Sequence, residues 1–170
     1  MADKNWYKFS HGVDQIRNIA YRVRASLLRD DEDSLAAMCL PVSRHLAQIL
    51  MDNGYGGAHV VRGTFTIDEP DPSHYKDWDV DDFIGTEDYE NEGANEEDYE
   101  EMEAAKFTPL HYWVMVGNLV IDITADQFND ELEEPYEEVV VEPIGNVSDR
   151  YTIITENFIE PRIMYNWAKI

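Results

Sequence analysis

Apolar residues recur along the chain with two periods, one typical of helices and the other of strands. Between Val13 and Leu28 they fall at three- and four-residue spacing, which predicts an amphipathic helix. A second segment of this kind follows Cys39: Pro41 suits its first turn and Gly54 marks its end. We therefore expect Cys39 at the N-terminal end of the second helix.

Other segments alternate apolar and polar residues, as strands do. AHVVRGTFTI (Ala58 to Ile67) predicts one strand, and LHYWVMVGNLVIDITADQF (Leu110 to Phe128) predicts a hairpin that turns at Gly-Asn. YEEVVVEP and RYTIIT predict two further strands. This order of elements predicts an α+β fold, with helices packed against an antiparallel sheet.

The register of the hairpin depends on its turn. If Gly117-Asn118 are the two loop residues, His111 and Asp122 become diagonal neighbours on one face of the sheet. Such positions lie roughly 7–8 Å apart between Cα atoms, close enough for an imidazole to meet a carboxylate. A slip of one residue would separate the two side chains, so the predicted pair depends on the predicted turn.

Cys39 is the only cysteine and the strongest nucleophile candidate. A thiol at a helix N-terminus meets the positive end of the helix dipole, which favours the thiolate. His111 would act as base and then acid, and Asp122 would orient its ring. His45 is a rival base, but it lies on the same helix as Cys39 and would have to reach back over the N-terminus. Each residue alone is more often structural; together they predict a catalytic site.

These segments also resemble a known arrangement. CLPVSRHLAQILMDNGYGGAHVVRGTF is similar to the part of transglutaminase-like and arylamine N-acetyltransferase-like proteins in which the nucleophilic Cys opens a helix, followed by a strand. HYWVMVGNLVIDITADQF resembles their His strand and Asp strand, and the order Cys, His, Asp is that of the papain-like superfamily. The resemblance covers roughly Ala36 to Phe65 and Leu110 to Phe128, under a third of the chain.

The resemblance implies a papain-like or transglutaminase-like core, with Cys39 as thiolate nucleophile, His111 as general base and Asp122 as third member of a triad. It implies thioester chemistry on an amide or ester, ending in hydrolysis or in transfer to an amine. Tyr112 and Trp113 are candidates for the wall of a substrate pocket, with core packing as the alternative. Candidate donors to an oxyanion are the backbone N–H of Cys39 and the side chains of Gln15 and Gln127.

The chain is strongly acidic, and its acidic residues are unevenly distributed. Thirteen Lys and Arg against 36 Asp and Glu give a net charge of −23, which disfavours direct nucleic-acid binding. Residues 68–103 hold 17 Asp and Glu against one Lys, which predicts an acidic surface insertion within a single domain of residues 1–170. Within it, KDWDVDDFIGTED has Asp82 and Asp88 where a calcium loop needs Gly and Glu, so we expect no metal site.

Two hypotheses for function follow. The first is a cysteine-dependent hydrolase or acyltransferase, related to cysteine proteases, which acts on an amide- or ester-bearing substrate such as a basic protein. The second is a non-catalytic binding or inhibitor protein whose acidic insertion engages a basic partner or mimics the charge of nucleic acid. We expect no cofactor and no membrane association. The N-terminus has no apolar signal-peptide core, so we expect a cytoplasmic protein, and its oligomeric state is left open.

Overall fold

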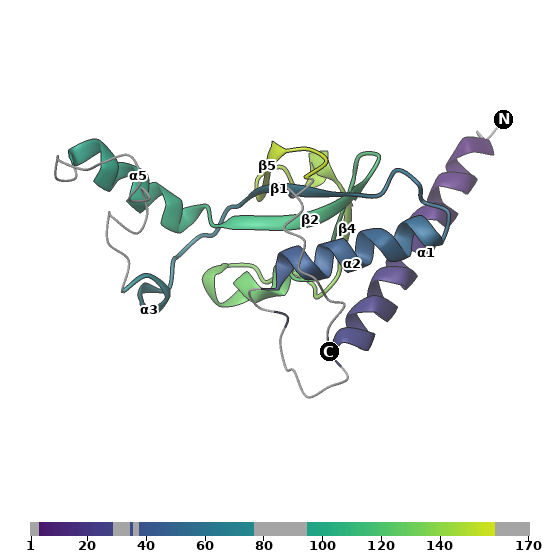
Figure 1. Ribbon diagram of the computed structural model, residues 1–170, viewed down its shortest axis with the longest axis horizontal. Coiled ribbons are helices and arrows are strands. Elements are labelled where there is room, and N and C mark those ends of the chain that lie inside the picture. Colours follow the sequence, from purple (N-terminus) through teal and green to yellow (C-terminus); the bar gives the residue numbers. More distant parts are fainter. Residues whose placement is uncertain (1–3, 29–34, 36–37, 77–94, 159–170) are drawn as a thin grey trace, which may run out of the picture.

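The computed structural model describes residues 4–28, 35, 38–76 and 95–158. Two longer helices come first along the chain, and the strands follow with short helical segments between them (Figure 1). The elements are α1 (Lys4–Leu27), α2 (Cys39–Asp52), β1 (His59–Phe65), α3 (Pro72–Tyr75), α5 (Glu96–Phe107), β2 (Leu110–Val116), β3 (Leu119–Asp122), the 3-10 helix η2 (Ala125–Glu131), β4 (Val140–Pro143), the 3-10 helix η3 (Ile144–Asn146) and β5 (Tyr151–Thr155).

The strands form one antiparallel sheet in the order β4-β3-β2-β1-β5. The first and last strands of this order are the sheet edges, and β2 is central. Helices α1 and α2 lie against the sheet. The predicted α+β fold with helices on an antiparallel sheet is therefore confirmed.

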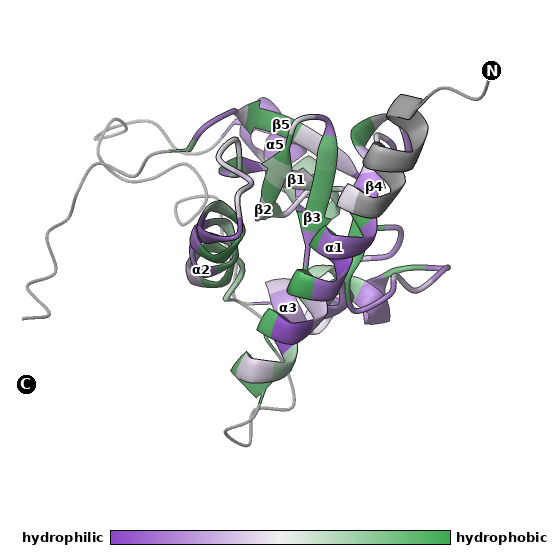
Figure 2. Cartoon of the chain, turned by 90° about the vertical axis from the view of Figure 1, so that its right-hand side faces the viewer, coloured by the Kyte–Doolittle hydropathy of each residue, from purple (hydrophilic) through white to green (hydrophobic). Residues whose placement is uncertain are grey.

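One face of the sheet packs against α1 and α2. Buried apolar side chains repeat at helical spacing along both helices, and Figure 2 shows them as green bands between purple hydrophilic ones. They meet every second residue of the central strands, because successive strand residues point to opposite faces. This core includes Ile16, Ala20 and Val23 of α1, Val42, Leu46 and Leu50 of α2, and Val60, Val114 and Ile121 of the sheet.

The opposite face of the sheet carries a second core, rich in aromatic residues. It is closed by η2 and by the segment that leads into β5 rather than by a long helix. Phe65 stacks on Phe128 with ring centroids 4.5 Å apart, and Tyr151 meets Phe65 edge to face at 5.1 Å. The buried members are Val61, Phe65, Ile67, Trp113, Met115, Val120, Ala125, Phe128, Val140, Val147 and Tyr151.

Local sequence accounts for the boundaries of α2 and of the hairpin. Pro41 lies in the first turn of α2, where its missing N–H breaks no helical hydrogen bond. Gly54 follows the last turn with a φ of 94°, a conformation that glycine adopts without strain. The first helix contains the predicted apolar stripe, although it begins at Lys4, nine residues before Val13.

The acidic segment 68–103 is described only in part, because residues 77–94, which contain most of the calcium-loop-like run, lie outside the described residues. Its described portions include the short helix α3 and most of α5. Figure 1 shows α5 extending away from the sheet, beyond the end at which β2 begins. Within the described residues, no helix is long and apolar enough to cross a membrane.

Candidate active site

His111 and Asp122 form a buried pair on the aromatic face of the sheet. The hairpin pairs Val114 with Ile121, and Gly117 at its turn has a φ of 60°, so the predicted register is confirmed. His111 Nε2 lies 2.6 Å from Asp122 Oδ2, and the two side chains are 0% and 1% exposed. The hairpin thus brings an imidazole and a carboxylate into contact in a dry interior.

Asp122 accepts four hydrogen bonds. Its Oδ1 accepts from the backbone N–H of Thr124 at 2.8 Å and from the Thr124 hydroxyl at 2.9 Å. Its Oδ2 accepts from the Tyr151 hydroxyl at 2.9 Å, in addition to the contact with His111. A buried carboxylate is costly unless its acceptor sites are filled, and here both oxygens have two partners.

These contacts determine the charge of the pair. Burial would raise the pKa of Asp122, but the charge of His111 and the hydrogen bonds from His111 and Thr124 hold that pKa below its usual value. Burial raises the pKa of Tyr151 well above its usual value, and the nearby charge of Asp122 raises it further. Tyr151 is therefore a neutral donor facing an ionised Asp122.

His111 is charged in the same arrangement. Burial would lower its pKa, but the charge and hydrogen bond of Asp122, together with the Cys39 thiol, raise the pKa of His111 to about 9. At neutral pH the residue is an imidazolium whose Nε2 faces a carboxylate. Because Asp122 occupies Nε2, Nδ1 is the ring nitrogen that can interact with another group.

Aromatic rings enclose the imidazole. Phe65 and Phe128 meet His111 edge to face, with ring centroids 5.8 Å and 5.1 Å away, and Trp113 lies tilted at 6.0 Å. These contacts leave the ring no room to rotate and keep water from Nε2. The imidazole is held both by its hydrogen bond and by its packing.

Cys39 is the first residue of α2, as predicted, and its side chain is half-buried. One turn later, the Ser43 hydroxyl donates a 3.1 Å hydrogen bond to the carbonyl of Tyr112, the residue after His111. This bond attaches the first turn of α2 to the beginning of β2. It brings Cys39 to the end of the sheet where His111 lies.

The Cys39 thiol interacts with the imidazole of His111, since it contributes to the raised pKa of that residue. Nδ1 of His111 is buried and makes no hydrogen bond among the described residues. Because Nε2 is engaged by Asp122, Nδ1 is the nitrogen left to exchange a proton with sulfur. A nucleophile and its base often lack a well-aligned hydrogen bond until substrate is bound.

The N-terminus of α2 adds backbone donors beside the sulfur. Met38 precedes the helix and supplies no side-chain cap, and no other described side chain caps it. Pro41 has no N–H, so the N–H groups of Cys39 and Leu40 are the donors that the first turn directs outward. Together with the helix dipole they can stabilise negative charge at this point.

The other predicted site residues are placed differently. Trp113 is 0% exposed in the aromatic core, on the same face as His111. Tyr112 points to the helix-covered face, is half-buried and packs against Phe158 with ring centroids 5.3 Å apart. Their proposed role in lining a substrate pocket stays a prediction.

The other candidate base and oxyanion donors lie on different elements. His45 is exposed and lines a cavity of about 250 Å³ with residues of α1 and of the last turns of α2. The Gln15 side chain accepts a 3.1 Å hydrogen bond from Tyr55, which follows the C-terminal end of α2. That end is roughly 20 Å from Cys39, because α2 has 14 residues at about 1.5 Å each. Gln127 lies on η2, five residues after Asp122.

Sequence reasoning missed three residues that support the pair. Thr124 is two residues from Asp122, and an Asp side chain that binds the backbone two positions on is a recognisable local motif. Tyr151 has no local signal. Arg24 of α1 donates to the carbonyl of Ile123 and binds the Asp126 carboxylate at 3.0 and 2.6 Å, which holds the turn that follows Asp122.

Compared with protein-family models, with curated proteins and with solved structures, the chain has no match. The resemblance to papain-like enzymes therefore rests on the residues and their arrangement alone. The fold and the site define an α+β protein that has a buried His–Asp pair and a cysteine at a helix N-terminus.

Proposed function

We propose that the chain is a cysteine-dependent hydrolase or acyltransferase acting on an amide or ester, with Cys39 as nucleophile, His111 as general base and acid, and Asp122 as the residue that orients His111. The observation that carries the proposal is the buried contact of 2.6 Å between His111 and Asp122. The Cys39 thiol also contributes to the raised pKa of this imidazole. A purely structural His–Asp pair needs no thiol beside it.

The chemistry would proceed in two steps. The Cys39 thiolate attacks the substrate carbonyl carbon, and Nδ1 of the His111 imidazolium gives its proton to the departing amine or alcohol, which leaves a thioester. His111 then accepts a proton from water or from an acceptor amine, which attacks the thioester and releases the acid or the transferred acyl product. A pKa of about 9 provides the imidazolium for the first step at neutral pH.

The tetrahedral intermediate in each step carries an oxyanion. We assign the N–H groups of Cys39 and Leu40 at the start of α2 as its donors, and the absence of a capping side chain among the described residues supports this assignment. Half-buried Cys39 gives the substrate access to sulfur, while His111 stays fully buried. The charged pair would thus remain dry during the reaction.

Acyl transfer from an activated ester tests this proposal. Incubation with p-nitrophenyl acetate should release a burst of p-nitrophenol equal to the enzyme concentration, and intact-protein mass spectrometry should find one acetyl group on Cys39. Cys39→Ser should give no burst, and His111→Gln should slow it strongly although the thiol is retained. Acetylation of lysines only, or a burst of the same rate in His111→Gln, would refute the proposed mechanism.

One observation favours the alternative of a binding protein. Helix α5 extends from the body of the protein with Met102 as its single buried residue, and Tyr99 on it is 54% exposed (Figure 1). A helix polar on nearly all sides that carries an exposed aromatic residue is suited to contact a partner. Its acidic residues are Glu96, Glu97, Asp98, Glu100, Glu101 and Glu103.

Salt-dependent capture of a basic protein would support this alternative. Binding that weakens steeply with ionic strength, and that is lost when the six carboxylates of α5 are converted to amides, is the expected result. Retention of binding in the amide variant would contradict the binding-protein alternative. A cytoplasmic location remains part of the main proposal, because reducing surroundings protect a free thiol from oxidation.

A further inference from the structure

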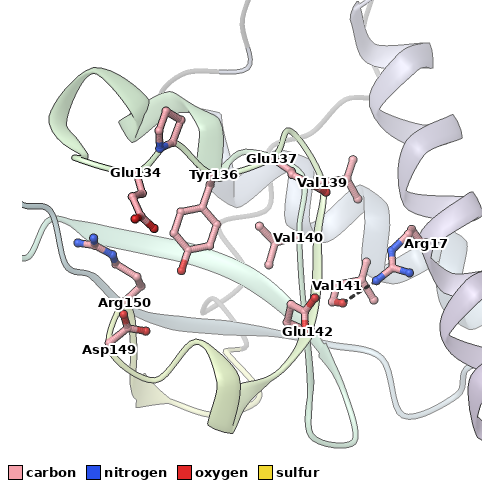
Figure 3. Close-up of a pocket in the computed structure, with 11 residues that line it drawn as sticks. Arg17, Glu134, Tyr136, Glu137, Val139, Val140, Val141, Glu142, Asp149 and Arg150 are labelled. Atoms are coloured by element: carbon pink, nitrogen blue, oxygen red, sulfur yellow. Dashed lines mark hydrogen bonds between the residues drawn. The ribbon is translucent and has the colours of Figure 1, made fainter.

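A cavity of about 680 Å³ lies beside the edge strand β4, and Cys39 is not among the residues that line it (Figure 3). It is formed by β4, the residues that precede it, the two residues before β5 and one side chain of α1. The residues that line it are Arg17, Glu134, Pro135, Tyr136, Glu137, Val139, Val140, Val141, Glu142, Asp149 and Arg150.

Four carboxylates of the lining lie outside the ion pairs of the described residues. Glu134, Glu137, Glu142 and Asp149 form no ion pair among the described residues. Glu134, Glu137 and Asp149 are exposed, and Glu142 is half-buried. The cavity therefore presents uncompensated negative charge on both sides of Tyr136 (Figure 3).

Both arginines of the lining are already paired. Arg150 binds the carboxylate of Asp68 through two hydrogen bonds of 2.8 Å. Arg17 donates a 3.1 Å hydrogen bond to the Val141 carbonyl and lies 3.7 Å from Asp14. With the two partner carboxylates included, six acids face two arginines, a net charge of −4. The cavity thus attracts cations rather than anions.

The middle of the cavity is apolar and rigid. Tyr136 is half-buried and meets Phe65 and Tyr151 edge to face, with ring centroids 5.6 Å and 6.4 Å away. Val140 lies beside Tyr136 in Figure 3. An aromatic ring fixed in this way can receive a planar cation on its face and the aliphatic stem of a long side chain against its edge.

We propose that this cavity binds an arginine side chain of a basic polypeptide segment. A guanidinium matches the lining better than an ammonium does, because it is planar, stacks on aromatic rings and offers five N–H donors to several carboxylates at once. The stem of the arginine would pack on Tyr136 and Val140, and its head would reach Glu137 and Glu142.

The cavity shares a wall with the candidate active site. Val140 lies opposite Asp122 in the β3–β4 pairing, and Tyr136 contacts Tyr151, whose hydroxyl binds Asp122. A polypeptide held here would lie next to the proposed catalytic unit, on the side of Asp122 that faces away from His111. The inference nevertheless stands on the cavity alone and does not require that Cys39 react.

Peptide binding to the full chain carrying Cys39→Ser tests the inference without any catalysis. The probe is a capped Gly-Arg-Gly peptide, with the Lys peptide and the neutral citrulline peptide as analogues, followed by NMR shifts of Tyr136 and Val140. We expect the Arg peptide to bind best, the Lys peptide more weakly and the citrulline peptide not detectably. The triple variant E134Q/E137Q/E142Q should weaken Arg-peptide binding by about tenfold or more, since each tenfold corresponds to the loss of one or two good contacts.

A matched variant separates this site from general attraction by an acidic protein. E100Q/E101Q/E103Q on α5 removes the same charge elsewhere and should change the affinity by less than about twofold at physiological salt, where exposed charges beyond roughly 8 Å are screened. Equal weakening in the two variants, citrulline binding as strong as that of arginine, or no shift at Tyr136 and Val140 would overturn the inference. Thermal melting of each variant confirms that it is folded.

Discussion

The Tyr151 hydroxyl donates a 2.9 Å hydrogen bond to Asp122 Oδ2, the same oxygen that His111 Nε2 approaches at 2.6 Å. Tyr151 begins β5, whereas Asp122 ends β3, and two strands of the sheet lie between them. The bond therefore spans β1 and β2 and ties the orientation of the carboxylate to the edge of the sheet. We interpret Tyr151 as a positioning residue for the His–Asp pair.

Tyr151→Phe removes this bond and keeps the ring. The aromatic contacts with Phe65 and Trp113 do not involve the hydroxyl. We expect the free energy of unfolding to fall by about 1–3 kcal/mol, because a buried ionised acceptor loses a donor. Denaturant unfolding measures this loss. Tyr136→Phe is the matched control, because the Tyr136 hydroxyl donates none of the four hydrogen bonds that Asp122 accepts. An equal loss in the two variants would contradict a specific role for Tyr151.

The stability of the protein should depend on the hydroxyl of Thr124 and not on the shape of its side chain. Its backbone N–H and its hydroxyl both donate to Asp122 Oδ1. Thr124→Val keeps the volume and the backbone donor, so we expect a loss of about 1–3 kcal/mol of unfolding free energy from the hydroxyl alone. Thr124→Ser keeps the donor and should lose clearly less. Greater destabilisation by Ser than by Val would mean that packing of the methyl group, and not the hydrogen bond, explains this residue.

Stability should fall in mildly alkaline solution. The pKa of His111 is raised from 6.5 to about 9, so the folded state binds this proton more tightly than the unfolded chain does. The corresponding stability is fully present below pH 6.5 and is lost as the pH rises through about 9. The difference corresponds to on the order of 3 kcal/mol. Unfolding curves across this range should show the decline in the wild type and not in His111→Gln. A flat wild-type profile would contradict the buried imidazolium.

Gly63 should tolerate no side chain. It is paired with His111 across β1 and β2, and a Cβ built there would lie 2.1 Å from the Thr152 carbonyl and 2.3 Å from the Trp113 ring. We expect Gly63→Ala to lower the free energy of unfolding by about 1–3 kcal/mol or more, because the ring or β5 must move. Near-ultraviolet circular dichroism should register the change around Trp113. Gly57→Ala is a control, since its Cβ would meet nothing within 4 Å.

The local parts of the fold and site could be predicted from sequence. The apolar spacing and Pro41 placed Cys39 at the beginning of α2, and the Gly-Asn turn alone determined that His111 and Asp122 share a face. These relations depend on residues within one helix or one hairpin, where the periodicity of the chain decides which side chains are neighbours.

The remaining parts depend on contacts that the sequence does not indicate. Tyr151 reaches Asp122 only because β5 pairs with β1, and nothing in RYTIIT selects that neighbour. Arg24 is separated by 99 and 102 positions from its partners Ile123 and Asp126. A charged residue is rarely buried unless it is paired. The carboxylate that pairs with Arg24 is brought to it only when the whole chain has folded.

The rate of alkylation of Cys39 tests the central claim most directly. Because Cys39 is the only cysteine, all thiol reaction with iodoacetamide reports on this position. The proposed thiolate–imidazolium pair predicts fast alkylation near neutral pH, slowed by about tenfold or more in His111→Gln and reduced in Asp122→Asn as well. Folding of each variant is checked by thermal melting. A wild-type rate like that of an ordinary thiol, unchanged in His111→Gln, would contradict the proposed nucleophile and base.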